Sequence, residues 1–349
     1  MTRVPPARSD VARRFLVHEL PNARSVKTGL SLLTSVAIAG CGGPQSALVT
    51  AGRDAEQIAH LFTVMALGAV IIWAAVVGIA IYAIRSRREV HSQREANLLI
   101  IGGGVALPTV VLGALLAYGL PVLPAVLRPA PDGALRIHVT GKQWWWRVQY
   151  MTAAGTVETA NELRLPVGQR VELQLSSPDV IHSFWVPSIT GKMDMIPGRL
   201  TRIALEPTRT GVFRGACAEY CGASHALMAF LVVVTEPREF DAWLEAQGRP
   251  AQAAQDALSA RGEAAFIANG CGACHTVRGT AADGIVGPDL THVGSRLRLG
   301  AGTLPNEPEA FVRWIAQTDR IKPGVHMPAF RALSSDDLSV LAAYLDGLQ

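Results

Sequence analysis

Two long stretches without a charged residue constrain this chain most strongly. Residues 60–84 and 98–127 contain no Asp, Glu, Lys or Arg. Each is longer than the roughly 20 residues that a helix needs to cross a bilayer core. A pair of buried core helices is the alternative, but uncharged stretches of this length are unusual in soluble proteins. The sequence therefore predicts a two-helix transmembrane hairpin over residues 41–128, with helices at about 60–84 and 98–123.

The segment between these helices predicts their orientation. It reads RSRREVHSQRE and carries four arginines. Short loops rich in Lys and Arg stay on the cytoplasmic side of a membrane. Everything after about residue 129 is therefore expected on the periplasmic face of a bacterial inner membrane. Cysteines in such an oxidising compartment form disulfides, bind metals or are covalently modified.

The first 40 residues have the composition of a targeting segment. They carry six Lys or Arg and two acidic residues, so their net charge is +4, which equals the formal net charge of the whole chain. The basic balance therefore does not indicate a nucleic-acid partner. A short apolar run ends in the sequence IAGC at Cys41, which resembles the bacterial lipoprotein box. This predicts a signal sequence over 1–40 and lipidation of Cys41; a plain signal sequence with an incidental cysteine is the alternative.

Residues 129–246 change from apolar helices to short strands. Runs rich in β-branched and aromatic residues are separated by Gly, Pro, Asn and Asp. No helical period runs through this range, and the pattern predicts an all-β sandwich or barrel. Residues 217–228, CAEYCGASHALM, lie between two of the predicted strands and so form a strand-to-strand loop.

This loop concentrates metal-binding groups. A disulfide between Cys217 and Cys221 would leave His225 and Met228 without a role. Zinc binds Cys and His but has little use for a thioether. Thiolate, thioether and imidazole together favour copper, and two cysteines instead of one predict two copper ions bridged by both thiolates. A second imidazole must come from elsewhere, and His182, at the end of an earlier strand, is the best candidate.

The order of these groups resembles a known redox site. With the backbone carbonyl of Glu219 as a second weak ligand, the set is similar to the binuclear CuA site of cytochrome c oxidase subunit II: His182, Cys217, Glu219, Cys221, His225 and Met228. The resemblance covers residues 60–245 and includes the run QWWW at 143–146 and the segment HSFWVPSITGKMDMIPGR at 182–199. It implies a cupredoxin sandwich that delivers electrons to subunit I. It also implies Trp144 as the electron-entry residue and the Glu219 carboxylate as a ligand of Mg²⁺ at the subunit I interface.

Two positions depart from the family pattern. Lys142 stands where members often have a histidine before Gln-Trp, and no consequence follows from this. Many members also place a carboxylate in the first turn of the second membrane helix, at a proton-uptake entrance. Here the nearest acids, Glu95 and Glu89, lie further toward the cytoplasm, so a proton-entry role is not carried over to this chain.

Residues 252–349 contain a second cofactor motif, Cys271-Gly-Ala-Cys274-His275. Cys-x-x-Cys-His is the attachment signature of c-type haem, in which two thioethers hold the porphyrin and the histidine ligates iron. Because the motif is short, a redox dithiol is the alternative.

Features further along the chain favour haem. The segment GPDL at 287–290 has the spacing of small cytochromes c, in which the proline carbonyl orients the histidine. Met327 is the only methionine after residue 228, and the final SSDDLSVLAAYLDGLQ has the capped start and apolar face of a closing helix. The region resembles an all-α class I cytochrome c with His275 and Met327 as axial ligands. His326 and His292 are rival ligands, but a thioether better suits a high-potential haem.

These assignments use all five cysteines of the chain. The combined resemblance implies subunit II of a haem-c-containing cytochrome c oxidase, with subunits I and III and the lipid bilayer as partners. Electrons from external cytochrome c, or another donor, would pass through the fused haem and the copper pair to the haem and copper centres of subunit I. There O₂ is reduced, coupled to proton pumping.

Two other functions are possible from the motifs alone. A copper-delivery protein also combines Cys-x-x-x-Cys with a distant histidine, but its fold would be thioredoxin-like and its histidine would follow the cysteines. A copper-containing nitric oxide or nitrous oxide reductase component would keep the sites and change the terminal partner. The two-helix anchor and the segment 182–199 favour the oxygen reductase.

Overall fold

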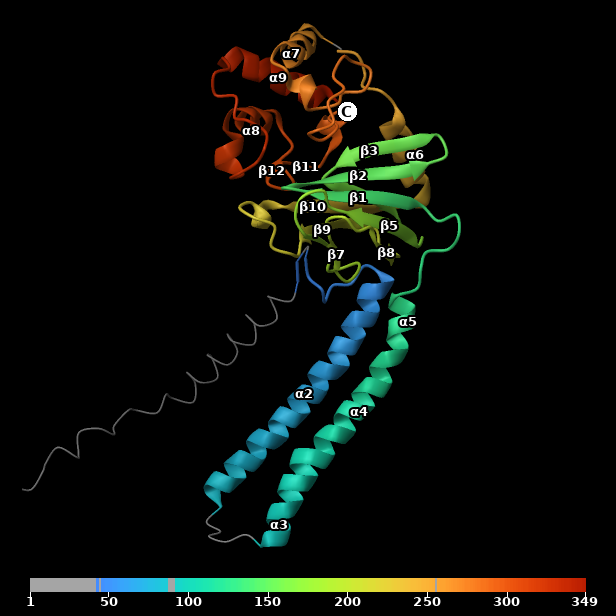
Figure 1. Ribbon diagram of the computed structural model, residues 1–349, viewed down its shortest axis with the longest axis vertical. Coiled ribbons are helices and arrows are strands. Elements are labelled where there is room, and N and C mark those ends of the chain that lie inside the picture. The colour runs from blue at the N-terminus through green and yellow to red at the C-terminus, as the bar shows by residue number, and fades with distance from the viewer. Residues whose placement is uncertain (1–41, 44, 87–91, 255) are drawn as a thin grey trace, which may run out of the picture. The chain divides into compact units, whose positions relative to one another are not determined.

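The chain folds into a helical hairpin, a β-sandwich and a helical domain (Figure 1). The computed structural model describes residues 42–43, 45–86, 92–254 and 256–349. The predicted signal sequence, Cys41 and Glu89 lie outside these residues, so the predictions made for them stay predictions. Residues 44–349 group as one unit by their contacts.

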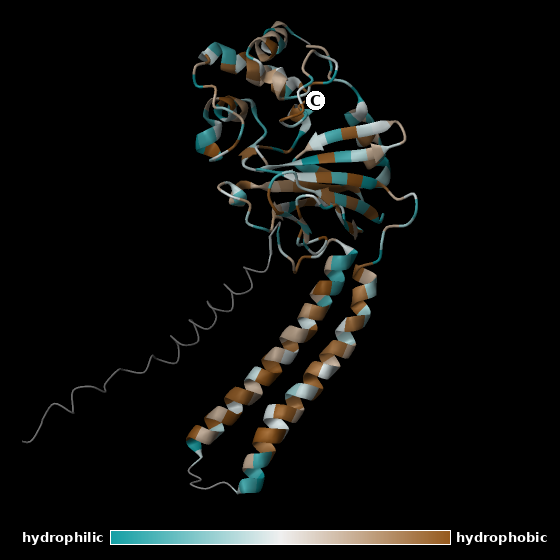
Figure 2. Ribbon diagram, viewed as in Figure 1, coloured by the Kyte–Doolittle hydropathy of each residue, from teal (hydrophilic) through white to brown (hydrophobic). Residues whose placement is uncertain are grey.

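Two described helical segments are long and apolar enough to cross a membrane: α2 (Arg53–Arg85) and the run Gln93–Val126. That run joins α3 (Gln93–Asn97), π-helix η2 (Leu98–Ala106), α4 (Leu107–Gly119), 3₁₀ turn η3 (Leu120–Val122) and α5 (Leu123–Val126). Their most apolar windows are not buried against protein, and the hydrophobic colours dominate both segments in Figure 2. A hydrogen bond of 2.9 Å joins Tyr118 Oη to His60 Nδ1 across the hairpin.

The first helix begins at Arg53, earlier than the expected residue 60, because its polar first turn is anchored to the β-sandwich. Arg53 forms an ion pair of 2.7 Å with Glu206. Asp54 and Arg170, both buried, approach to 3.4 Å. These charged groups can be helical without entering a bilayer because they lie where the helix meets the sandwich.

The β-sandwich consists of two mixed five-stranded sheets. One has the order β3-β2-β1-β5-β8 and the other β4-β10-β9-β6-β7. The strands of the first sheet are β1 (Arg136–Lys142), β2 (Trp145–Thr152), β3 (Gly155–Ala160), β5 (Val171–Ser176) and β8 (Thr201–Leu205). Those of the second are β4 (Glu162–Pro166), β6 (His182–Trp185), β7 (Met193–Met195), β9 (Gly211–Cys217) and β10 (Ala229–Thr235).

Strict alternation places the sandwich core between the two sheets. In β5, Val171, Leu173 and Leu175 are buried while the residues between them are partly exposed. Such a period of two gives each strand one apolar face. At the centre, Trp146 meets Phe184 edge-on and the rings of Phe184 and Phe230 stack at 4.9 Å. The aromatic centre of the core therefore lies beside β6 and the start of β10.

The helical domain follows α6 (Pro237–Gly248) and contains α7 (Ala257–Ala268), α8 (Pro308–Ile321) and α9 (Ser335–Gly347), with a small hairpin of β11 (Arg298–Leu299) and β12 (Leu304–Pro305). Helices α7 and α9 cross closely, since a Cβ on Gly262 would lie 2.1 Å from the carbonyl oxygen of Val340. The Ser334 hydroxyl accepts from the Asp337 amide and caps α9, as predicted.

The predicted fold class is confirmed in all three parts. Helices α6 and α8 and strands β3 and β7 were not predicted from the sequence. Both helices begin with a proline in the first turn. Proline is common at this position of a helix, but in a sequence it also marks turns and loops, so it did not indicate a helix here.

Candidate metal centre and haem cavity

Strand pairing brings the predicted copper ligands together. His182 opens β6, Cys217 ends β9, and these strands pair with Phe184 opposite Cys217. The loop 218–228 then returns to β10 and folds its 3₁₀ turn η4 (His225–Leu227) back over the strand ends. The histidine and the loop therefore meet at one end of the sandwich although they are far apart in the sequence.

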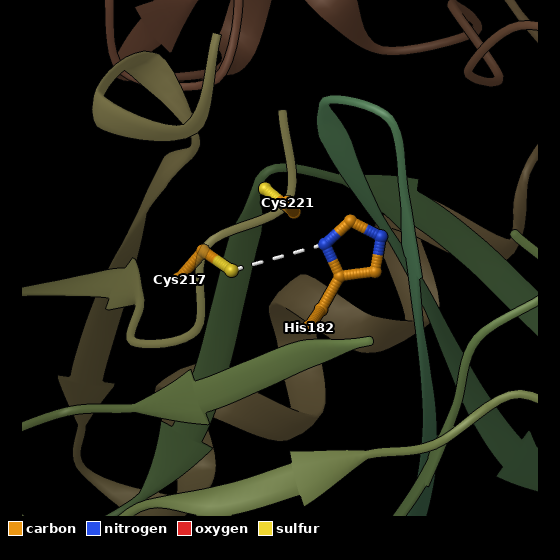
Figure 3. A group of neighbouring side chains, drawn as sticks. All are labelled: His182, Cys217 and Cys221. Carbon is orange, nitrogen blue, oxygen red and sulfur yellow. Dashed lines mark hydrogen bonds between the residues drawn. The ribbon is translucent and has the colours of Figure 1, made fainter. Parts of the chain in front are cut away.

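The sulfur and nitrogen atoms converge on one small volume. The ligand atoms of His182, Cys217 and Cys221 all lie within 4.8 Å of one another (Figure 3). Cys217 Sγ lies 3.8 Å from His182 Nδ1, and Cys221 Sγ lies 3.5 Å from His225 Nδ1. Met228 Sδ is 3.7 Å from Cys221 Sγ. All six predicted copper-binding groups thus belong to one cluster, because the Glu219 carbonyl oxygen also lies 3.1 Å from Cys217 Sγ.

Asp179 completes this cluster and was not predicted from the sequence. Its Oδ1 lies 2.8 Å from His182 Nε2, so Nδ1 of the same ring faces Cys217. Its Oδ2 accepts from the Gln143 amide at 2.8 Å, which ties the loop before Trp144 to the histidine. The only signal in the sequence is its position three residues before His182.

The charges of the cluster favour a bound cation. A hydrogen bond from Cys221 lowers the pKa of Cys217 to about 4, and the pKa of Cys221 is raised by the same contact. Burial lowers the pKa of His182, but hydrogen bonds with Asp179 and Cys217 outweigh it and raise the pKa to about 9. Burial likewise raises the pKa of Asp179, which its hydrogen bonds from His182 and Gln143 hold at about 2. The His182 ring thus lies between a thiol and a carboxylate, at 3.8 Å from Cys217 Sγ and 2.8 Å from Asp179 Oδ1.

The three consecutive tryptophans have three different environments. Trp146 is in the core, and Trp145 is half-buried beneath Lys142 and Arg147, where it lines the cavity described below. Trp144 is 6% exposed, and its indole N–H donates to the Cys221 carbonyl at 2.9 Å. Trp144 is therefore the tryptophan in contact with the copper loop, as predicted.

The Glu219 carboxylate points away from the cluster. Its side chain is 45% exposed, and Lys192 Nζ lies 3.9 Å from it and 2.7 Å from Asp194. The carbonyl and the carboxylate of this residue thus lie on opposite sides of the loop, one toward sulfur and one toward solvent.

A cavity of about 400 Å³ lies in the helical domain, against the strand ends of the sandwich. The CxxCH segment forms a 3₁₀ turn (Cys271–Ala273) on its wall, and His275 Nδ1 lies 2.8 Å from the Pro288 carbonyl oxygen. The predicted orienting contact is therefore present. Cys271, Cys274, His275 and Met327 all line the cavity, together with Phe266, Phe311, Ile315, Leu341 and Leu345.

The rival axial ligands differ in their surroundings. Both ring nitrogens of His292 face main-chain carbonyl oxygens, of Gln349 at 2.8 Å and Arg249 at 3.1 Å, which leaves neither for iron. His326 lines the cavity but is exposed, with its ring 6.4 Å from that of Trp144. Met327 packs against the core of the helical domain. Two thiols, an imidazole and a thioether around apolar walls fit a covalently bound haem.

The cysteines that the structure describes are all free thiols, available for these roles. Family models match both outer parts of the chain: "Cytochrome C oxidase subunit II, periplasmic domain" over residues 151–235 and "Cytochrome c" over residues 259–349. Cytochrome c oxidase subunit 2 of Bacillus subtilis is 31% identical over 355 residues, covering 92% of this chain and 96% of that protein. This chain belongs to the cytochrome c oxidase subunit 2 family.

Other members of the cytochrome c oxidase subunit 2 family match a shorter part. The relative from Alkalihalophilus pseudofirmus is 39% identical over 218 residues, and the match spans 62% of that protein, less than two thirds. A crystal structure of the periplasmic domain of cytochrome oxidase subunit II from Bradyrhizobium japonicum is 35% identical with a TM-score of 0.33; it covers 34% of this chain and 97% of that one.

Family membership confirms the resemblance and decides between the interpretations of the cysteine loop. A copper-delivery protein would have a thioredoxin-like fold, whereas the loop lies at the end of a two-sheet sandwich. The two family models imply copper in the sandwich and haem in the helical domain. The dithiol and zinc interpretations of the two motifs are thereby superseded.

Proposed function

We propose that this chain is the subunit II of a terminal respiratory oxidase that receives electrons on its own haem c and passes them through CuA to the haem and copper centres of subunit I. Those centres reduce O₂, coupled to proton pumping. The donor is cytochrome c or another external carrier, and subunit III is a further partner. The sandwich and the helical domain lie on the periplasmic face, and the hairpin crosses the inner membrane.

The copper pair would be held by side chains that the fold has already brought into contact. Cys217 and Cys221 would supply the thiolates, and His182 and His225 the imidazoles, since each ring faces one of the two sulfurs. Met228 and the Glu219 carbonyl would be the weak ligands. A bridged copper pair supplies a one-electron acceptor whose charge is shared by two metals. Because Cys217, Cys221, His182 and Met228 are buried and already in contact, little rearrangement is needed when the charge of the site changes.

Cys271 and Cys274 would hold the haem through thioether bonds, and His275 and Met327 would ligate its iron. The Pro288 carbonyl accepts from His275 Nδ1, which would leave Nε2 for the metal. The apolar wall keeps water away, and both this and the thioether raise the reduction potential. A raised potential makes the haem a better acceptor of electrons from the external donor and lies in the range suited to a carrier that feeds copper.

The position of Trp144 is the observation that carries this proposal. Its indole donates to the Cys221 carbonyl at 2.9 Å and also lines the haem cavity. One side chain thus contacts both the copper loop and the space for the haem. Trp144 is 6% exposed, so an external carrier cannot reach it, and the fused haem is the entry point.

Further assignments concern the surroundings of the subunit. The exposed Glu219 carboxylate, beside Lys192 and Asp194, is a ligand of Mg²⁺ at the subunit I interface. Oxygen ligands on a protein surface suit Mg²⁺, which usually takes only one or two carboxylates from one chain.

Cys41 carries a lipid after removal of the signal sequence.

Optical and EPR spectroscopy of the purified full-length chain tests the proposal. We expect a low-spin haem c spectrum together with the hyperfine pattern of one electron shared equally by two copper nuclei. His182→Ala should remove the copper signal and keep the haem, while His138→Ala, a control in the same sandwich, should keep both. Stoichiometric zinc without copper, or the signal of a single type 1 copper, would contradict the proposal.

A further inference from the structure

Two segments of the helical domain touch the residues around the copper loop. We call these contacts the junction: residues 300–302 and 322–327 on one side, and Trp144, Ser224 and Ala229 on the other. The Ala229 amide donates to the Ala301 carbonyl at 3.2 Å, and Ser224 Oγ donates to the Pro323 carbonyl at 2.6 Å. The first contact adjoins Met228, the second adjoins His225, and segment 322–327 ends at Met327.

Lys322 links both segments of the junction to Trp144. Its Nζ donates to the Trp144 carbonyl at 2.6 Å and to the Gly300 carbonyl at 3.0 Å. The residue is 2% exposed, and it lines the haem cavity. Lysine is rarely buried so completely without a carboxylate partner, and its two acceptors here are both main-chain oxygens.

Burying this amine has a cost that requires a reason. Burial lowers the pKa of Lys322 to about 7, because the charged ammonium is less stable in the protein interior than in water. A methionine would fill the same space without that cost. Unlike methionine, the lysine donates two hydrogen bonds, and these join Trp144 to the helical domain.

The close packing beside Lys322 makes the junction sensitive to small displacements. A Cβ on Gly324 would lie 2.9 Å from Trp144 Cη2, so segment 322–327 approaches the indole as closely as a glycine allows. Gly324 also has a φ of +79°, a conformation that favours glycine. A segment held by fewer bonds would separate from the indole and carry Met327 with it.

We propose that Lys322 is a positioning residue for electron transfer: its bonds to Trp144 and Gly300 hold the Met327 segment against the Trp144 indole and thereby set the rate of transfer from the haem to the copper domain. This rests on the proposed function. Lys322 itself carries no electron and binds no metal.

Other hydrogen bonds cross between the two domains, and they provide a matched control. Lys142 Nζ donates to the Val286 carbonyl at 3.1 Å, and Lys142, like Lys322, lines the haem cavity. Lys142→Met therefore removes one lysine bond between the same two domains, but no bond to segment 300–302 or 322–327. Lys322→Met keeps the apolar stem and removes both bonds.

The experiment uses the full-length chain in the assembled oxidase. After spectra have verified both cofactors, a photoreductant reduces the haem, and its reoxidation by copper is followed optically. Reduction potentials are measured for every variant so that rates are compared at equal driving force. We expect Lys322→Met to slow the transfer about tenfold or more, as for other small misplacements of reacting groups, and Lys142→Met to change it less than about twofold.

A wild-type rate in Lys322→Met, with both spectra intact, would overturn the inference and leave the proposed function standing. Absence of copper or haem signals in the wild-type chain would instead overturn the proposed function, and this inference with it. If Lys322→Met fails to retain haem, Gly324→Ala decides, because its methyl group pushes the same segment from the indole while Lys322 stays. A slowed transfer then supports the inference, and a wild-type rate overturns it.

Discussion

The two cofactor sites are built in opposite ways. In the sandwich, the predicted copper ligands already contact one another, with sulfur-to-nitrogen distances of 3.5 and 3.8 Å. In the helical domain, the predicted haem ligands stand around a cavity of about 400 Å³. A metal would therefore enter a site whose ligands are already in contact. A haem would instead fill the cavity and form a large part of the core of the helical domain. The two domains should therefore depend on their cofactors to very different degrees.

The strongest test removes the haem. In a Cys271→Ser/Cys274→Ser chain, haem is not attached, and an open cavity of about 400 Å³ remains. At about 24 cal/mol per Å³ such a cavity costs on the order of 10 kcal/mol, which is comparable to the whole stability of a domain. We expect α7, α8 and α9 to lose protection in hydrogen exchange while the sandwich strands keep theirs. Persistent protection of α7 and α9 would show that the haem is not part of the core.

The matching change in the sandwich removes a copper ligand. Cys217→Ser should abolish the copper signal and the oxidation of the haem by copper, since a bridging thiolate is lost. The sandwich should nevertheless stay folded: Cys217 itself belongs to the core, but the aromatic part of that core, Trp146, Phe184 and Phe230, packs without a metal. Circular dichroism and hydrogen exchange of β1 to β10 check this. Unfolding of the sandwich would remove the contrast between the two sites.

A smaller effect is expected from the axial thioether. Met327→Leu leaves both thioether bonds and His275 in place, so the haem should be retained. Loss of the sulfur ligand should lower the reduction potential, measured by optical redox titration. His326→Ala serves as the comparison, since that ring also lines the cavity. A lowered potential in the His326 variant alone would assign the ligand to His326.

The smallest effect concerns the residue behind His182. Asp179→Asn removes the charge that orients the imidazole and should reduce copper affinity about tenfold to hundredfold, as for other partners of metal-bound histidines. Competition with a copper chelator measures the affinity. Asp241→Asn, at an exposed position of α6, is the control and should leave it unchanged. Equal affinities in the two variants would mean that the sandwich alone orients His182.

Local patterns determined much of this protein from the sequence. The uncharged stretches predict the hairpin because hydrocarbon excludes charge whatever the surroundings. The CxxCH motif, and the spacing of Cys217, Cys221, His225 and Met228, predict their cofactors because ligand chemistry needs those atom types close together. His182 could be added only because the ligand set lacked one imidazole.

Only the tertiary structure decided how these parts work together. Nothing but the family resemblance distinguishes Trp144 from its two neighbours in the sequence. The tertiary structure puts Trp146 in the core, leaves Trp145 half-buried at the cavity and places Trp144 against the Cys221 carbonyl. Asp179 and Lys322 belong to no motif, and their partners lie on other elements. Their roles depend on contacts between segments far apart in the chain, and such contacts exist only once the sheets and the two domains have packed.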